Sequence, residues 1–242
     1  MSRTLRYALL AALLPAGLIL TGQHLRADEA PRLLPAPQLD APRASGPAMQ
    51  TPAMQTIVLS GGCFWGVQGV FEHVKGVESA ISGYTGGARD TAQYETVSTG
   101  STGHAESVKV TFDPARISLG NVLRIFFSVA LDPTRTDGQG PDQGSQYRSE
   151  IWTTNADQAR IAHAYIAQLD QAHAFGASIA TRVDPLGGFY PAERYHQDYL
   201  ALNPDAAYIA VNDMPKVQAL QRLFPADWRA EPKTVLDQRP PA

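Results

Sequence analysis

The sequence predicts an α+β domain with one mixed β-sheet and helices packed against it. Strand-like and helix-like segments interleave between residues 56 and 228, but they do not alternate as regular strand–helix units. Turns that are rich in Gly or contain Asp-Pro separate these segments. The chain has 242 residues, of which 44% are hydrophobic and 18% are charged, so it can bury one sizeable core.

The first half of the domain is expected to contain three strands and one helix. A short apolar run and two partly alternating runs indicate strands, whereas apolar residues at spacings of three and four indicate the helix. A stretch with many Gly, Ser and Thr residues indicates a loop. We expect strands at 57–59, 77–84 and 104–112, a helix at 64–74 and a loop at 88–103.

The second half is expected to be richer in helix. Ser118 and Asn155 precede amphipathic runs, and both residue types are favoured helix N-caps. A long loop rich in Gly, Asp and Pro follows the first of these helices, and loops of that length are often functional. We expect helices at 118–129, 155–175 and 216–223, strands at 146–153 and 178–183, a loop at 132–144 and a partly helical segment at 189–203.

Both ends of the chain are expected to lie outside the folded domain at 56–228. Residues 1–27 combine a basic start with an apolar stretch, which is typical of a secretory signal peptide cleaved near Ala27; an uncleaved membrane anchor is the alternative. Residues 28–55 carry six prolines and indicate a Pro-rich linker, and residues 229–242 indicate a loose C-terminal tail. We therefore expect export to the periplasm.

The composition excludes two classes of protein. A net charge of −3 leaves no basic surplus for binding nucleic acid. One cysteine and six histidines do not form the spacing of a zinc site, so we expect no metal. In an exported protein, where cysteines are often paired, a single cysteine indicates a reactive thiol.

That cysteine, Cys63, lies between a predicted strand and a predicted helix. Gly61 and Gly62 precede it and permit a tight turn close to other backbone. A cysteine at a helix start faces backbone N–H groups and the positive end of the helix dipole, so we expect a lowered thiol pKa. A buried, unreactive cysteine is the alternative.

Five stretches resemble, in order, the motifs of the A-class peptide methionine sulfoxide reductases. They are 62–66 (GCFWG), 83–87 (GYTGG), 102–106 (TGHAE), 142–149 (DQGSQYRS) and 195–199 (YHQDY). The resemblance covers residues 56–203 or so. It implies a two-layer, ferredoxin-like fold. It also implies thiol-dependent reduction of methionine S-sulfoxide, free or in proteins, as a repair reaction.

Two residues make chemical sense for that reaction without the resemblance. Reduction of a sulfoxide needs a nucleophile for sulfur and a proton for the departing oxygen, and Cys63 can supply the nucleophile. Glu106 shares a strand face with Val108 and Val110, where an ionised carboxylate would be costly. It can therefore stay protonated and donate the proton. An ordinary surface glutamate at a strand start is the alternative.

The resemblance implies further site residues. Tyr84 and Tyr147 would donate hydrogen bonds to the sulfoxide oxygen, and Asp142 would help to hold the site. Each could instead be a core tyrosine or a turn aspartate.

Aromatic residues would receive the substrate. Phe64 and Trp65 resemble the wall that contacts the sulfoxide methyl group, and contacts of this kind with aromatic rings are favourable. Tyr195 and His196 would line the same basin or, equally, pack in the core.

The reaction would leave a sulfenic acid on Cys63, which must be reduced again. The relatives commonly carry further cysteines that do this, and this chain has none. We expect an external thiol to form a mixed disulfide with Cys63, supplied by a thioredoxin-like or glutaredoxin-like donor or by a small thiol. No organic cofactor is implied, and we expect a monomer.

The chain also departs from the family pattern. Asp137 and Gly138 stand where many relatives have an Asn-Arg pair, and Arg194 stands where an acidic residue is usual. Two other functions are alternatives: a cysteine hydrolase or acyltransferase, which would need a histidine base beside Cys63, and a module that only binds oxidised methionine. The second should tolerate the loss of Cys63 and Glu106.

Overall fold

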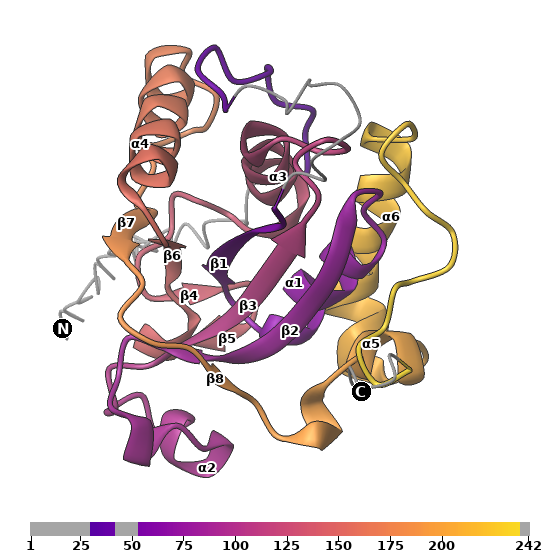
Figure 1. The fold of residues 1–242 in the computed structure, drawn as a ribbon. Helices are drawn as coiled ribbons and strands as arrows, with labels where there is room; N and C mark the ends of the chain where they lie inside the picture. The colour runs from indigo at the N-terminus through magenta and orange to yellow at the C-terminus, as the bar shows by residue number, and fades with distance from the viewer. Residues whose placement is uncertain (1–29, 42–52, 238–242) are drawn as a thin grey trace, which may run out of the picture.

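The computed structural model describes residues 30–41 and 53–237, and its centre is a mixed sheet of six strands (Figure 1). All neighbours are antiparallel except β6 and β7, which are parallel. In spatial order the strands are β7 (Arg182–Pro185), β6 (Ser149–Thr153), β1 (Gln55–Gly61), β3 (Ala105–Phe112), β2 (Val77–Thr85) and β8 (Tyr190–Pro191). The predicted α+β class is confirmed.

The helices cover one face of this sheet, which is the rear face in Figure 1. These helices are α1 (Phe64–Glu72), α3 (Leu119–Ile125), α4 (Ala156–Gln171), α5 (Tyr199–Leu202) and α6 (Met214–Leu223), whereas the short helix α2 (Tyr94–Val97) lies beyond the lower end of the sheet in Figure 1. Short π-helical turns continue α3 at Phe126–Ala130 and precede α6 at Ile209–Asp213. The main core lies between the helices and the sheet, so the site residues that point to this side are desolvated.

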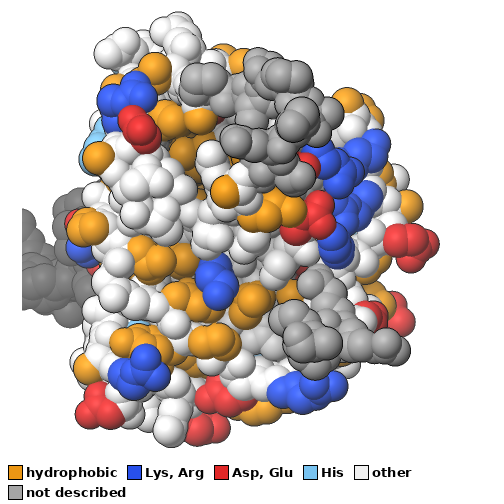
Figure 2. All heavy atoms as spheres, in the orientation of Figure 1, with side chains coloured by type: hydrophobic (Ala, Val, Ile, Leu, Met, Phe, Trp, Pro, Cys, Tyr) orange, Lys and Arg blue, Asp and Glu red, His pale blue; other side chains and the backbone are white. Residues whose placement is uncertain are grey.

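The opposite face of the sheet carries only a small buried cluster in the part of the chain that the structure describes. It consists of Val58, Ala105 and Trp152, with Leu186 and Phe189 packed against it. Figure 2 shows this face, where hydrophobic side chains lie among uncharged ones and most charged groups lie toward the margins.

Local capping explains where two of the helices begin. The Ser118 hydroxyl accepts a hydrogen bond from the Asn121 N–H at 3.2 Å, and the Asn155 side chain accepts one from the Gln158 N–H at 3.0 Å. Each cap satisfies a backbone donor that the first helical turn leaves without a partner. Both predicted N-caps are confirmed.

Two predicted strand boundaries differ from the structure. The segment expected at 146–153 begins with a 3₁₀ turn and becomes strand β6 only at Ser149, and the strand expected at 178–183 is β7 at Arg182–Pro185. Tertiary contacts hold the residues before β7: the Asp170 carboxylate accepts from the Ile179 N–H at 2.9 Å, and the Ala180 N–H donates to the Pro133 carbonyl at 2.7 Å. Such contacts have no signature in a short window of sequence.

The predicted Pro-rich linker at 28–55 is corrected over residues 30–41, which lie against the domain. Leu34 is 2% exposed and belongs to the main core. The Arg124 guanidinium donates to the Leu34 carbonyl at 2.7 Å, and the Tyr165 hydroxyl donates to the Pro35 carbonyl at 2.8 Å. This extended segment is therefore part of the folded unit, and β1 begins at Gln55.

The predicted loose tail at 229–242 is also docked as far as residue 237. The Arg229 N–H donates to the His73 carbonyl at 2.8 Å. The Asp198 carboxylate accepts from the N–H groups of Val235 and Leu236 at 3.0 and 2.7 Å.

The predicted signal peptide at 1–27 lies outside the described residues, as do linker residues 42–52 and tail residues 238–242. Within the described ranges, none of the helices has the length and apolar character needed to span a bilayer.

Candidate active site

Cys63 lies at the junction of β1 and α1, as the sequence predicts. It is the N-cap residue of α1 and is 8% exposed. The turn before it needs Gly62, whose φ is +87° and where an added Cβ would lie 2.5 Å from the Gln139 side chain. The strand, the turn and the helix thus fix the position of the Cys63 sulfur at the start of α1, which lies at one end of the molecule.

The predicted lowering of the Cys63 pKa is wrong for the resting site. Burial raises the thiol pKa well above its usual value, and the carboxyl groups of Glu106 and Asp213 add to this. The backbone N–H of Trp65 acts in the opposite direction, as expected at a helix start, but it is the weaker effect. Position at a helix start can be predicted from sequence, whereas the depth of burial cannot.

Glu106 lies in β3 on the core side of the sheet, directly opposite Tyr84 of β2. The carboxyl group is buried, and one of its oxygens, Oε2, accepts from the Phe64 N–H at 3.0 Å. Burial raises its pKa to about 8; the Phe64 hydrogen bond opposes this rise, and the charge of Asp142 reinforces it. Glu106 therefore holds a proton at neutral pH beside the first turn of α1.

Tyr84 does not have the environment that the sequence predicted. Its ring is fully buried and lies 5.8 Å from the Phe64 ring. Its hydroxyl donates to Glu193 Oε2 at 2.9 Å, so the O–H is already committed. Its predicted contact with a sulfoxide oxygen is therefore corrected to a hydrogen bond that fixes Glu193.

Tyr94 lies near Cys63 and Glu106 and is joined to Tyr84 through Glu193. Glu193 Oε1 accepts from the Tyr94 N–H at 2.9 Å, which anchors the short helix α2 over the site. Burial raises the Tyr94 pKa, and so do the charges of Glu106 and Cys63 near its hydroxyl. Tyr94 was not predicted as a site residue because it lies in a segment that was expected to be a polar loop. A single aromatic residue in such a loop was the signal that could have indicated a functional role.

Tyr147 also lies near the Cys63 sulfur and the Glu106 carboxyl group. Burial raises its pKa, and the groups that add to this include Glu106, Asp142, Cys63 and Tyr94. Two neutral phenols, Tyr94 and Tyr147, thus face the thiol and the protonated carboxyl group together.

Asp142 is held by a tyrosine that the sequence analysis did not single out. It lies in β5 (Asp142–Gln143), which pairs with β4 (Gly138–Gln139) in a small hairpin. The Tyr208 hydroxyl donates to the Asp142 carboxylate. Two residues that depart from the family's sequence pattern lie close to Asp142: Asp137 directly precedes this hairpin and Gly138 is its first residue. Neither departure removes Asp142 from the site.

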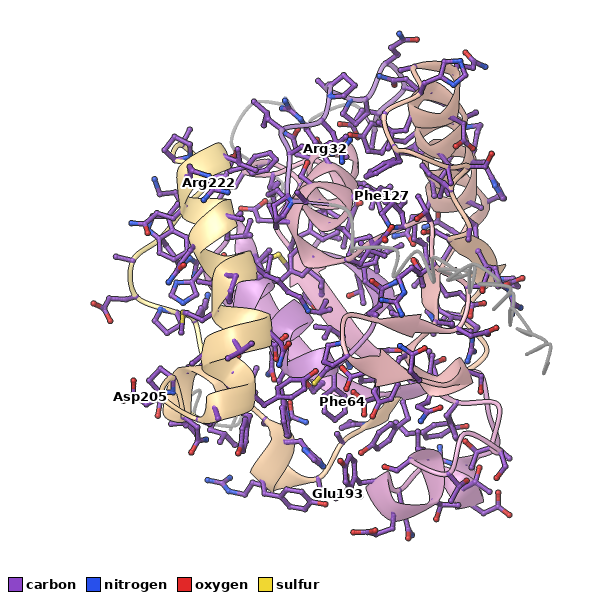
Figure 3. The ribbon with its side chains drawn as sticks, turned by 180° about the vertical axis from the view of Figure 1, so that it is seen from behind. Arg32, Phe64, Phe127, Glu193, Asp205 and Arg222 are labelled. Atoms are coloured by element: carbon purple, nitrogen blue, oxygen red, sulfur yellow. The ribbon has the colours of Figure 1, made fainter. Side chains whose placement is uncertain are left out.

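The aromatic residues form a compact group beside Cys63. Trp65 stacks on Tyr199 with ring centroids 4.0 Å apart, and its indole N–H donates to His196 Nδ1 at 3.2 Å. His196 is buried 5.1 Å from the Phe64 ring, and burial lowers its pKa, so it is a neutral wall of the site. Tyr195 is 60% exposed and lies at the rim. In Figure 3, Phe64 and Glu193 lie at this same end of the molecule.

A cavity of about 240 Å³ opens beside the sulfur. Its polar wall is formed by Asp142, Tyr208, Asn212 and Lys216 in addition to Cys63. Its apolar wall is formed by Phe127, Val129, Leu131 and Phe175. The cavity gives a small ligand access to Cys63. Among the described residues, no group of three or more His, Cys, Asp or Glu side chains could hold a metal ion.

The fold and this geometry define a cysteine enzyme that pairs a nucleophilic sulfur with a protonated carboxylic acid. No histidine is hydrogen-bonded to Cys63 in the described residues, although a cysteine hydrolase would need such a base.

Comparisons with known proteins specify the class further. The sequence model of the family described as peptide methionine sulfoxide reductase matches residues 55–227. The peptide methionine sulfoxide reductase MsrA 2 of Mesorhizobium japonicum is 56% identical over 179 residues, which is 74% of this chain and 92% of the relative. This chain belongs to the peptide methionine sulfoxide reductase family, class A.

Solved structures agree with this assignment. Methionine sulfoxide reductase A of Corynebacterium diphtheriae is 33% identical with a TM-score of 0.56, and the match covers 75% of this chain and 89% of that one. Mxr1 of Saccharomyces cerevisiae in reduced form is 30% identical with a TM-score of 0.57, covering 65% and 90%. The chain is an oxidoreductase that reduces methionine sulfoxide, and the hydrolase and binding-module alternatives are not favoured.

Proposed function

We propose that Cys63 attacks the sulfur of methionine sulfoxide while Glu106 protonates the departing oxygen. One observation carries this proposal: a carboxyl group whose pKa is about 8 lies buried beside the N-cap cysteine. In sum, the S–O bond of the substrate breaks and the oxygen passes to the Cys63 sulfur. Methionine gains two electrons, and the thiol becomes a sulfenic acid that retains the hydrogen.

Tyr94 and Tyr147 hold the sulfoxide oxygen during this step. Both are neutral O–H donors that face Cys63 and Glu106, so they can stabilise negative charge as it develops on the oxygen. Burial keeps the proton on Glu106, and the charge of Asp142, whose position is fixed by Tyr208, reinforces this effect.

The aromatic group receives the methyl end of the substrate. Phe64 and Trp65 offer ring faces next to the sulfur, and contacts of sulfur or methyl groups with such rings contribute about 0.3–1.5 kcal/mol. Tyr195 at the rim is placed to contact the peptide that carries the oxidised residue. We assign the S epimer as the substrate.

Regeneration requires an external thiol because Cys63 is the only cysteine in the chain, and a dithiol can supply both thiolates that the two steps need. A donor thiolate attacks the sulfenic sulfur, so that an S–S bond forms and the S–O bond breaks; the oxygen leaves as hydroxide, which takes a proton from the solvent to become water. The donor's second thiolate then attacks this mixed disulfide and releases Cys63 as a thiolate. A thioredoxin-like or glutaredoxin-like protein is the proposed donor. The basic and apolar start of the chain supports export to the periplasm.

The test is turnover of a peptide that contains each epimer of methionine sulfoxide, with dithiothreitol as reductant. The wild-type protein should reduce the S epimer alone, and Cys63→Ser should reduce neither. Turnover of the R epimer would overturn the assignment of the epimer, and turnover by folded Cys63→Ser would overturn the assignment of the nucleophile. Trapping of a mixed disulfide at Cys63 by an exported dithiol protein would support the proposed donor.

A further inference from the structure

An ion pair between a buried aspartate and a partly buried lysine lies beside the reactive sulfur and has no part in the chemistry described so far. Lys216 Nζ lies 3.0 Å from Asp213 Oδ1, and the two side chains are 21% and 0% exposed. The other carboxylate oxygen, Asp213 Oδ2, is buried without a hydrogen-bond partner among the described residues. Because desolvating two charges offsets most of their attraction, such a pair is weak evidence for a role in stability alone.

The pair is packed directly against the helix turn that begins at Cys63. An added Cβ at Gly66 would lie 2.2 Å from Asp213 Oδ1 and 3.0 Å from Lys216 Nζ. The absence of a side chain at residue 66 therefore lets both charges approach the first turn of α1. Lys216 and Cys63 also line the same cavity.

The charges around Cys63 come from several elements. Glu106 of β3 and Asp213 at the start of α6 disfavour a thiolate, and Lys216 in the first turn of α6 favours one. The other ionisable groups that face the sulfur are Tyr94 of α2, Tyr147 of the 3₁₀ turn Ser145–Tyr147, and Tyr208. Asp142 of β5 lines the same cavity. Among the charged side chains of the described residues that act on the sulfur, Lys216 is the positive one, and it acts in the same direction as the Trp65 backbone N–H.

We propose that Lys216, held by Asp213, is a positioning residue whose charge stabilises the Cys63 thiolate. The role rests on the proposed function, in which Cys63 must carry negative charge twice. It does so when it attacks the sulfoxide sulfur, and again when it leaves the mixed disulfide as the donor's second thiolate forms the new S–S bond. In that second step the electron pair of the broken S–S bond goes to the Cys63 sulfur, next to the ammonium group.

The test uses two substitutions that break the same ion pair from opposite sides. Lys216→Met removes the positive charge, so the pH profile of Cys63 alkylation by iodoacetamide should move up by roughly one unit, about a tenfold loss of thiolate at fixed pH. Asp213→Asn removes the negative charge and leaves the ammonium group in place, so the profile should move down. Because the chain has a single cysteine, the alkylated fraction of the peptide that contains it reports on Cys63 alone.

Opposite shifts cannot arise from a merely structural role, which would change both variants in the same direction. Two further variants act as controls: Lys216→Arg keeps the charge and should restore most of the thiolate, and the double variant Asp213→Asn/Lys216→Met should return the profile close to wild type. If Lys216→Met fails to fold, Asp213→Asn alone decides, and an unchanged or upward profile overturns the proposal. Alkylation needs no sulfoxide, so this result is independent of whether the proposed reductase chemistry holds.

Discussion

A carboxyl group that donates a proton at neutral pH has to hold that proton before the substrate arrives. Glu106 meets this condition because burial raises its pKa to about 8. The protonated form is present below that value and is lost as the pH rises through it. The single-turnover rate of sulfoxide reduction, measured against pH, should therefore carry a falling limb near pH 8 that belongs to Glu106.

Replacement of Glu106 isolates this contribution. Glu106→Gln should lower the single-turnover rate at pH 7 by about 10²–10⁴-fold, because the amide cannot protonate the oxygen. Its residual rate should also lack the falling limb. Glu106→Asp keeps a carboxylic acid but moves it away from the sulfoxide oxygen, because the side chain is one methylene group shorter. This variant should retain part of the rate. A Glu106→Gln enzyme with an unchanged profile would show that another group supplies the proton.

Matched Phe variants can show whether Tyr94 or Tyr84 donates a hydrogen bond to the sulfoxide oxygen. Tyr94→Phe removes a hydroxyl that lies near Cys63 and interacts with Ser98, so the rate should fall by roughly 10- to 100-fold with only a small change in stability. Tyr84→Phe removes the buried donor to Glu193, so it should cost about 1 kcal/mol in the free energy of unfolding and have the smaller direct effect on chemistry. Urea unfolding and single-turnover rates for both variants measure this, and the reverse ranking of rates would restore Tyr84 to the reaction.

At the scale of elements, the segment 30–41 behaves as part of the core. Leu34→Ala should lower the free energy of unfolding by about 2–5 kcal/mol, because Leu34 is 2% exposed and its loss leaves a cavity. Its neighbour Leu33 is 54% exposed, so Leu33→Ala is a matched control that should change stability by less than about 0.5 kcal/mol. Equal effects in urea unfolding would show that the segment does not pack in solution.

Features that depend on a short stretch of sequence were predictable, whereas the burial of segment 30–41 was not. Ser118 and Asn155 were predictable as caps because a cap depends on residues three positions apart. Cys63 at a strand–helix junction and Glu106 on an apolar strand face were predictable from periodicity. Leu34 was not, because its burial depends on α3 and α4, which lie far along the chain.

The residues of the active site also fall into a group that the sequence predicted and a group that it did not. Local motifs located Cys63, Glu106, Tyr147 and Asp142, whereas partners that arrive from distant segments were missed. Such partners are Tyr94, Glu193, Tyr208, Asp213 and Lys216. The prediction that the Tyr84 hydroxyl contacts the sulfoxide oxygen was wrong for the same reason. Its hydrogen-bond partner, Glu193, lies far along the chain and cannot be predicted from the strand that carries Tyr84.

At the scale of the whole molecule, a second buried carboxyl group links stability to pH. Glu72 of α1 is buried, and neither of its oxygens has a hydrogen-bond partner among the described residues. Burial and the neighbouring Asp198 carboxylate raise its pKa to about 9. Asp198 in turn accepts hydrogen bonds from Val235 and Leu236, so α1 and the segment around these two residues meet at this acid.

The sign of the effect follows from proton binding. A carboxyl group whose pKa is higher in the folded than in the unfolded chain binds more protons when folded, so its contribution to stability is full below the unfolded value, near 4.5, and is lost as the pH rises toward 9. Glu72→Gln keeps the shape but cannot ionise. Its free energy of unfolding should therefore fall less steeply than that of the wild type between pH 5 and 9, as measured by urea unfolding at several pH values. Glu95→Gln, which alters an exposed carboxylate, should keep the wild-type slope, and a Glu72→Gln slope equal to it would mean that Glu72 is ionised in the folded protein.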